Sequence, residues 1–161
     1  MPLSPEKRQE LLQGRRIATL ATENEDGSIY LTAVWYLFED PHFYISTFSA
    51  SRKARNAAAR PKAAVMVDAR RAAEERGVSA SGRVEILHGQ ESKEINQRIH
   101  ARYLSTEALA DPSVGPVLEN MSDITLRLTP NSWVSWDEQE LDAQVFSGKL
   151  CGTPGYLLPL E

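Results

Sequence analysis

The run from Ser28 to Phe38 constrains the fold more than any other part of this sequence. Its apolar side chains alternate onto two faces, one with Ile29, Leu31, Ala33, Trp35 and Leu37 and the other with Tyr30, Val34, Tyr36 and Phe38. A strand that is apolar on both faces is buried on both faces. The turn-forming cluster 23–27 joins it to a strand-like run, 17–22, as an antiparallel hairpin. We therefore expect a barrel interior on one side, and a second layer, a subunit or a flat aromatic ligand on the other.

The rest of the chain predicts further antiparallel strands with helices inserted between them. Strand composition recurs at 42–48, at 62–68, at 78–87 with a bulge at Gly82, and at 123–136 with a break at Pro130. Helical patterns occupy 4–14, 51–60, 91–104 and 114–121, with a helical turn expected within 69–77. Glycine and proline are frequent in 137–161, which predicts a mostly irregular arm. The expected fold class is mainly β, as a single domain over 1–161 with a core at about 5–136.

Composition limits the classes of partner. The 161 residues are 42% hydrophobic and carry a net charge of −4, which suits one globular domain and argues against a general surface for nucleic acid or anionic membrane. No apolar run approaches the roughly 20 residues of a spanning helix, and the N-terminus lacks the pattern of a signal peptide. We therefore expect a cytoplasmic protein. Its single cysteine, Cys151, cannot form an internal disulfide.

A candidate anion site lies at the end of the third expected strand, 42–48. Ser46 and Thr47 end the run 42–48, and a helix opens shortly afterwards with Ser51, Arg52 and Lys53. Hydroxyl donors, two cations, and the unpaired N–H groups and positive dipole of a helix N-terminus together suit a phosphate group. The same pattern also fits an ordinary N-capped helix with two solvated basic side chains.

Other candidate chemistry is weaker. The three histidines, His42, His88 and His100, have no metal-ligand spacing, so we expect surface or structural roles for them and no metal site. Cys151 has no base nearby in sequence. The basic helix 51–60 lacks the aromatic stacking platform of a nucleic-acid site. No catalytic side chain is predicted.

The order and spacing of these features resemble the pyridoxamine 5'-phosphate oxidase-like superfamily, the FMN- or deazaflavin-binding split β-barrel, over about residues 5–136. The matching segments are 17–22, Asp26-Gly27, 33–36, 44–47, 51–56, Pro61, 64–67, 82–84, and Pro130 ahead of Trp136. No single one of these segments is specific, whereas their order and spacing together are.

The resemblance implies a set of cofactor-binding residues. The family's serine-arginine-lysine helix start, which holds the FMN phosphate, matches Ser51, Arg52 and Lys53, and the hydroxyl-bearing end of the preceding strand matches Ser46 and Thr47. The family lays the isoalloxazine ring along the backbone at the positions of Thr32, Ala33, Val34 and Trp35. Trp136 matches a late tryptophan that the family brings towards the flavin, often from the neighbouring subunit. A core or interface aromatic is the alternative role for Trp136.

The chain also departs from the family pattern. An arginine that helps to bind the FMN phosphate in the oxidase falls near Leu31 or Thr32, where this chain has no cation. A glutamine of the oxidase falls near Gly77 or Val78, and its Arg-x-His-x-Arg element for the substrate is replaced by Asp137-Glu-Gln-Glu-Leu. Pyridoxamine phosphate is therefore not the expected substrate.

The resemblance implies a flavin (FMN)-dependent oxidoreductase whose small-molecule substrate is not identified by the sequence. Such a protein needs no catalytic acid or base of its own, because the cofactor carries the redox chemistry. Two alternatives stay open: a reductase that depends on a deazaflavin coenzyme, and a non-catalytic carrier or sensor of flavin or haem. We also expect a homodimer with the cofactor at the interface, because the strand 28–38 has a second apolar face to cover.

Overall fold

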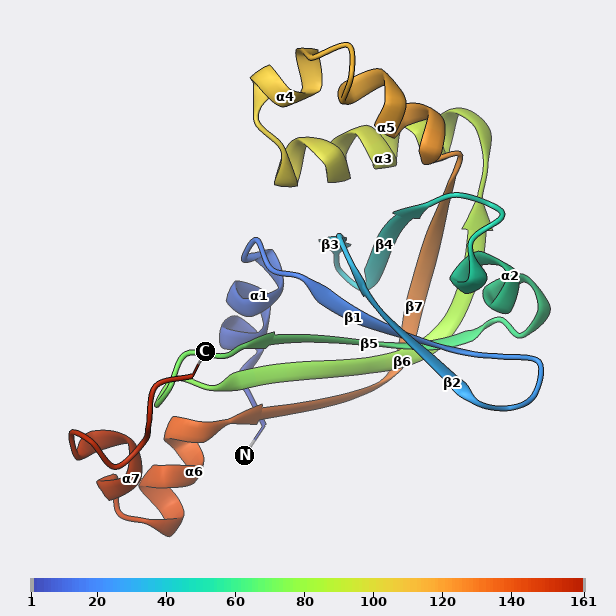
Figure 1. Ribbon diagram of the computed structural model, residues 1–161. Helices are drawn as coiled ribbons and strands as arrows, with labels where there is room; N and C mark the ends of the chain where they lie inside the picture. Colours follow the sequence, from blue (N-terminus) through green and yellow to red (C-terminus); the bar gives the residue numbers. More distant parts are fainter. Residues whose placement is uncertain (1, 161) are drawn as a thin grey trace.

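The computed structural model describes residues 2–160. Within this range the backbone forms one curled antiparallel sheet of seven strands, in the order β2-β1-β5-β6-β7-β4-β3 (Figure 1). The strands are β1 (Ala18–Glu23), β2 (Ile29–Val34), β3 (Leu37–Glu39), β4 (His42–Thr47), β5 (Lys62–Ala69), β6 (Arg76–Leu87) and β7 (Ile124–Asp137). The mainly β split barrel expected from the sequence is confirmed.

Seven helices accompany the sheet within residues 2–160 (Figure 1). They are α1 (Pro5–Gln13), α2 (Arg52–Ala59), α3 (Gly89–Tyr103), α4 (Thr106–Ala110), α5 (Gly115–Met121), α6 (Glu138–Val145) and α7 (Lys149–Gly152). The helices α3, α4 and α5 form a layer at the start of β7, and α6 and α7 follow its end. None of the helices in residues 2–160 is both long and apolar enough to cross a membrane.

The predicted helices α1, α2, α3 and α5 are present, and Ser4 and Ser51 cap α1 and α2 as their sequences indicate. Five expectations were wrong in detail, of which the last two concern the C-terminal arm and the run 28–38. The helix α4 was not expected, 70–75 holds turns and no helix, and β7 continues through Pro130 without a break. Pro130 lies opposite Gly82 at the expected bulge, where a residue without an N–H is tolerated.

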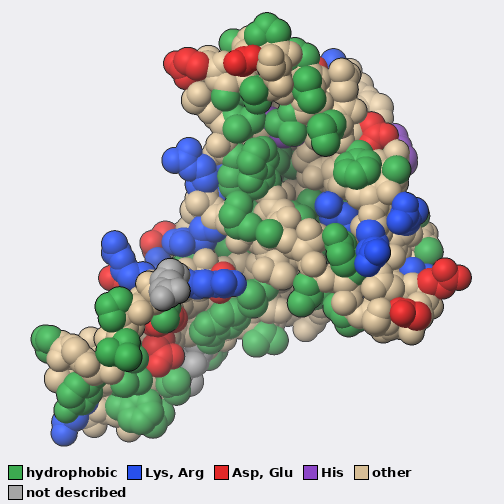
Figure 2. Space-filling view, viewed as in Figure 1, with side chains coloured by type: hydrophobic (Ala, Val, Ile, Leu, Met, Phe, Trp, Pro, Cys, Tyr) green, Lys and Arg blue, Asp and Glu red, His purple; other side chains and the backbone are tan. Residues whose placement is uncertain are grey.

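The C-terminal arm, residues 138–160, is the fourth correction, because it contains α6 and α7 where the sequence predicted mostly irregular chain. Asp137 caps α6 by accepting bonds from the backbone N–H groups of Gln139 and Glu140. Hydrophobic side chains gather on the arm, at the lower left of Figure 2. Those exposed on it are Leu141, Val145, Phe146, Tyr156, Leu158 and Leu160.

The sheet opens along a seam between its two edge strands. The run 28–38, predicted as one strand, divides into β2, which pairs with β1, and β3, which pairs with β4. Because β2 and β3 lie at opposite edges of the sheet, the short segment Trp35-Tyr36 connects the two edges. Tyr36 is fully buried, and its hydroxyl donates to the carbonyl oxygen of Leu12 at 2.9 Å, which anchors the connection to α1.

The outer face of β2 is uncovered within the chain. Ile29 and Leu31 expose 62% and 63% of their surface, whereas Val34 at the end of the same strand is buried. The prediction that one face of this strand points into the barrel is therefore confirmed at Val34. The other face, which was also predicted to be buried, has no cover among the described residues.

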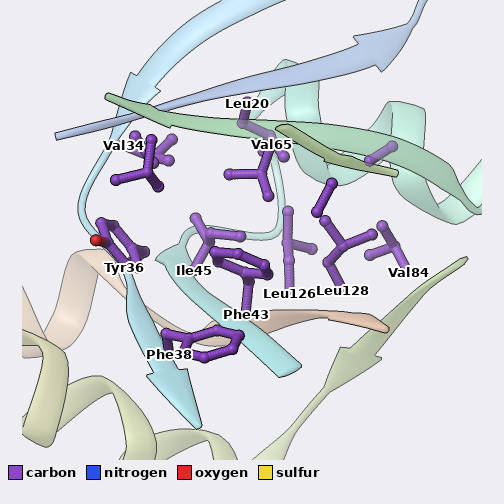
Figure 3. Packing of buried hydrophobic residues seen from close by; sticks show 14 of the residues in the cluster. Leu20, Val34, Tyr36, Phe38, Phe43, Ile45, Val65, Val84, Leu126 and Leu128 are labelled. Atoms are coloured by element: carbon purple, nitrogen blue, oxygen red, sulfur yellow. The ribbon is translucent and has the colours of Figure 1, made fainter. Parts of the chain in front are cut away.

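The core fills the inside of the curled sheet. In Figure 3 the side chains of Leu20, Val65 and Leu126 point towards one another from three different strands. Phe38 and Phe43 add an aromatic contact, with ring centroids 4.8 Å apart. Each fully buried side chain of this size contributes about 1.5–3 kcal/mol of hydrophobic stabilisation, so the core holds both edges of the split barrel in place.

Candidate cofactor site

A cavity of about 360 Å³ lies where the barrel splits. It is lined by Ile17, Ala33, Val34, Trp35, Ser46, Lys53, His100, Leu118 and Ser122. We call it the central cavity. Five of its lining residues, Ala33, Val34, Trp35, Ser46 and Lys53, belong to the set predicted from the sequence to bind a cofactor.

One wall of the central cavity is the end of the edge strand β2. Within the described residues β2 pairs only with β1, so its other edge carries backbone N–H and C=O groups outside the sheet. The indole of Trp35 continues this wall and is held by stacking on Tyr103, with centroids 5.0 Å apart and planes 3° from parallel. The wall therefore offers a flat surface with free backbone hydrogen-bonding groups beside it.

The helix α2 begins at the same place, and its cap is built from two predicted residues. The Ser51 hydroxyl oxygen accepts from the backbone N–H of Ala54 at 3.2 Å, and the hydroxyl of Thr47 donates to that oxygen at 3.1 Å. Both side chains are buried. Thr47 thus supports the cap, while the hydroxyl proton of Ser51 is not used in either bond.

The two adjacent cations of α2 face different spaces. Lys53 lines the central cavity, whereas the guanidinium of Arg52 lies 5.2 Å from the ring centroid of Tyr30. Arg52 lines a neighbouring open groove together with Arg55 and Arg60. Of these two cations, Lys53 therefore brings its charge to the central cavity, and Arg52 brings its charge to the groove.

The opposite wall comes from the helical layer and was not predicted. His100 of α3 is 2% exposed, and its Nε2 lies 3.2 Å from the hydroxyl oxygen of Ser46. Burial lowers the pKa of His100 below its usual value, and the negative charge of Glu119 opposes this shift. Leu118 of α5 and Ser122, the residue that follows this helix, complete this wall.

A signal for His100 was present in the sequence. The apolar stripe that predicts α3 includes Ile95 and Ile99, and His100 follows Ile99 directly, four residues after the buried Asn96. That position places His100 at the border of the buried face. The spacing of the three histidines along the chain bears on metal binding, but it does not indicate which of them is buried.

Five predicted residues do not line the central cavity: Thr47, Ser51 and Arg52, which belong to the α2 start, and also Thr32 and Trp136. Thr32 points its hydroxyl at the carbonyl oxygen of Ala33, 3.4 Å away. Trp136 pairs with Gly77 near the end of β7, twelve residues (136 minus 124) after Ile124, which pairs with Thr47 beside the cavity. Across the sheet, its neighbour Ser135 is joined to Val34 through Val78, Val67 and Ala18, and four strand spacings of about 4.8 Å place Trp136 roughly 20 Å from Val34. Trp136 therefore does not line the central cavity of its own chain.

The ring of Trp136 lies across Gly77. A Cβ atom at Gly77 would come within 2.0 Å of the indole, so only glycine fits opposite this side chain. Within its own chain Trp136 thus has the packing role that was the alternative in the sequence interpretation.

The family model described as pyridoxamine 5'-phosphate oxidase matches residues 4–130, which include β1 to β6 and both walls of the central cavity. The chain belongs to the pyridoxamine 5'-phosphate oxidase family. Among the curated proteins, none matches this chain.

Solved structures share the fold of this chain. A conserved hypothetical protein, Rv2991 from Mycobacterium tuberculosis, is 26% identical over 86% of this chain and 88% of its own, with a TM-score of 0.71. An F420 reductase is 20% identical over 81% of this chain and 98% of its own, with a TM-score of 0.65. A FAD-binding protein from Mesorhizobium loti is 22% identical over 84% and 95% of the two chains, with a TM-score of 0.60. The last two likenesses show the fold alone.

Proposed function

We propose that the protein binds FMN in the central cavity and acts as a flavin-dependent oxidoreductase on a small molecule other than pyridoxamine phosphate. The observation that supports this best is the meeting of the free edge of β2 with Ser46 and Lys53 in one cavity. Its volume of about 360 Å³ lies within the range of small-molecule sites, about 300–1,000 Å³.

The residues present fit the two parts of the cofactor. The hydroxyl proton of Ser51, the ammonium of Lys53 and the first N–H groups of α2 suit the phosphate. Arg52 borders the same helix start and would join them by leaving the face of Tyr30. The backbone from Thr32 to Trp35 suits a flat ring with polar edges, because the outer edge of β2 is outside the sheet.

FMN, when bound, supplies the electron-transfer chemistry. The chain's part is to hold the ring against Trp35 and to fix its phosphate at α2. The apolar side chains of Ile17, Val34 and Leu118 limit the access of water to the cavity. This division of roles agrees with the lack of a predicted catalytic acid or base.

A reductase that uses a deazaflavin coenzyme is the second candidate. The groove beside α2 is the observation that favours it, because three cations, Arg52, Arg55 and Arg60, line it on the helix side, opposite the acids Glu25 and Asp26 of the turn. Three cations on one side of the groove suit a cofactor whose anionic groups extend beyond the first phosphate. The similarity in fold to an F420 reductase supports the same candidate.

We further propose a homodimer with a cofactor site near the interface. Ile29 and Leu31 of β2 and Val134 of β7 are each more than 60% exposed, which leaves an apolar surface on the sheet. A second copy related by a twofold axis would cover it, in an interface of more than about 2,000 Å². The partner subunit could then bring its copy of Trp136 to a cavity that this residue does not reach within its own chain.

The visible spectrum of the purified protein tests the cofactor. We expect a flavin spectrum, with FMN released on denaturation, and oxidation of the reduced, loaded protein by an organic electron acceptor. A deazaflavin spectrum would support the second candidate. A haem spectrum would contradict both, and a flavin that no acceptor oxidises would favour a carrier.

A further inference from the structure

Three cavities meet at His100. Besides the central cavity, His100 lines a cavity of about 250 Å³ between α3 and the end of α5 with the turn that follows it, and another of about 280 Å³ between α3, α4 and α5. Its imidazole therefore stands between the barrel and the helical layer. Its contact with Ser46 links it to the end of β4, immediately before Thr47 and the α2 cap.

The central cavity is basic. Among the described residues that line it, Lys53 and His100 are the two that can carry positive charge, and none is a carboxylic acid. An anion that enters this cavity therefore meets two basic side chains and two hydroxyls, those of Ser46 and Ser122, without a competing acid.

The titratable groups that share the other two cavities with His100 are Lys93, Glu119 and Asp123. Glu119 accepts a bond from the side-chain amide of Gln97 at 2.6 Å, and Asp123 accepts two bonds from Ser49 at 2.7 Å. Both acids are thus engaged with other partners. His100 lacks a carboxylate at hydrogen-bonding distance among the described residues, so a bound anion would be its nearest negative partner.

We propose that His100 is an anion-binding residue of the central cavity, which acts with Ser46 on the phosphate of the bound ligand and takes up a proton as that phosphate binds. With its Nε2–H donated to the Ser46 oxygen, His100 leaves the Ser46 proton free to donate to the phosphate. The positive charge gained by the imidazole then adds to that of Lys53. This inference rests on the proposed phosphate site at α2 and extends it to a residue of α3.

The proposal has a measurable consequence for binding. In the free protein, burial lowers the pKa of His100. A phosphate beside the Ser46–His100 pair would raise that pKa, because an opposite charge within about 4–6 Å favours the charged form. Between the free and the bound pKa, binding takes up protons, and affinity rises as the pH falls.

Titration calorimetry with FMN, in two buffers of different ionisation enthalpy at pH 7, counts the protons taken up. The variant His100→Gln keeps a hydrogen-bonding group of similar reach and does not titrate. His42→Gln is the matched control, because His42 contacts Thr129 and lines none of the three cavities. We expect equal uptake by the wild type and His42→Gln, and less uptake by His100→Gln, with an affinity about tenfold weaker at pH 6.

Ser46→Ala provides a second variant, which keeps His100 and removes the hydroxyl group that joins His100 to the phosphate. It should also reduce proton uptake. Equal uptake by the wild type, His100→Gln and Ser46→Ala would overturn the proposal.

A second anion separates this proposal from the proposed cofactor. The phosphate of FMN titrates near pH 6, whereas inorganic sulfate stays a dianion. We expect sulfate to raise the melting temperature of the wild type more at pH 6 than at pH 8, and to lose this pH dependence in His100→Gln. If FMN does not bind and sulfate behaves in this way, the cofactor assignment fails and the role of His100 stands. If sulfate acts equally on both proteins at both pH values, the role of His100 fails.

Discussion

The two walls of the central cavity differ in how they are built. The barrel wall, from β2, β4 and α2, takes its lining residues from a short stretch of chain, Ala33 to Lys53, and backbone pairing within the sheet holds its strands. The helical wall takes His100, Leu118 and Ser122 from two helices of a separate layer. Under the proposed function, the barrel wall would provide general cofactor recognition, and the helical wall would adjust which ligand is bound.

Side-chain hydrogen bonds hold the helical wall on the barrel. The amide of Asn96 on α3 donates to the carbonyl oxygens of Ser122 and Ile124, each at 3.0 Å. Thr125 of β7 donates to the same amide's oxygen at 2.6 Å. Asn96 is 3% exposed, so this anchor is protected from water. It fixes α3, and with it His100, against the start of β7.

The largest expected effect concerns the oligomeric state, which should depend on the surface next to the barrel wall and not on the surface of the helical layer. The double variant Ile29→Lys/Leu31→Lys places two charges on the outer face of β2, next to the barrel wall, and should convert the proposed dimer to a monomer. Charging Val117 and Met121 on the helical layer, which are 47% and 56% exposed, is the matched control and should leave a dimer. Light scattering at micromolar protein measures both. A wild-type monomer, or dissociation in the control alone, would remove the proposed interface.

The next largest effect concerns the cations of the barrel wall. Arg52→Ala/Lys53→Ala should weaken FMN binding by about 2–4 kcal/mol, because charge-assisted bonds to phosphate are lost. We expect the larger share from Lys53, which lines the cavity. Arg70→Ala/Arg71→Ala removes the same charge from an exposed adjacent pair and is the matched control. If both double variants have the wild-type affinity by fluorescence titration, the phosphate is not bound at α2.

A smaller effect tests the cap that supports the barrel wall. Thr47→Val removes the bond to Ser51 and keeps the shape, which should cost about 1 kcal/mol of unfolding free energy, equally with and without FMN. Thr32→Val, on the neighbouring edge strand, should change stability by less than about 0.5 kcal/mol. Urea unfolding with and without ligand compares them. A loss for Thr47→Val that is seen only with FMN would show direct contact with the ligand.

The smallest expected effect lies in the helical wall. Burial lowers the pKa of His100 in the folded protein, so the unfolded chain binds more protons at acidic pH. The stability of the free wild type should therefore fall as the pH decreases below about 6.5, the ordinary pKa of histidine. His100→Gln should lose less stability over that range, and the exposed His88→Gln should follow the wild type. Parallel curves for all three proteins would show that His100 does not titrate differently on folding.

The fold was largely predictable because its strands carry clear alternation and its turns carry clear signals. The division of the run 28–38 into two strands at Trp35-Tyr36 was not predictable, because apolar side chains keep alternating while the chain passes from one sheet edge to the other. The helix α6 was missed, although Asp137 followed by acidic residues is a helix-start pattern. The glycines and prolines that predicted an irregular arm lie mostly beyond α6.

The barrel wall of the site was predictable because its residues form one continuous pattern that resembles a family. The helical wall was not. Whether His100 faces the barrel depends on how α3 packs on β4 and β7, which is decided by tertiary contacts such as those of Asn96. Arg52 and Lys53 face different spaces, and Arg52 lies against the ring of Tyr30. Tyr30 belongs to β2, which is distant from α2 in sequence, so this contact was likewise not predictable.

The central claim is that the cavity at the seam binds a flavin ring while α2 binds its phosphate. Titration of the wild type with FMN and with riboflavin, which has the same ring without the phosphate, tests it most directly. Trp35 lines the cavity, so quenching of flavin fluorescence reports the binding of either compound. We predict that the fluorescence of both compounds is quenched on binding. FMN should bind more tightly than riboflavin by about 2–4 kcal/mol, or roughly 30- to 800-fold. Equal affinities, or no binding of either compound, would contradict the account.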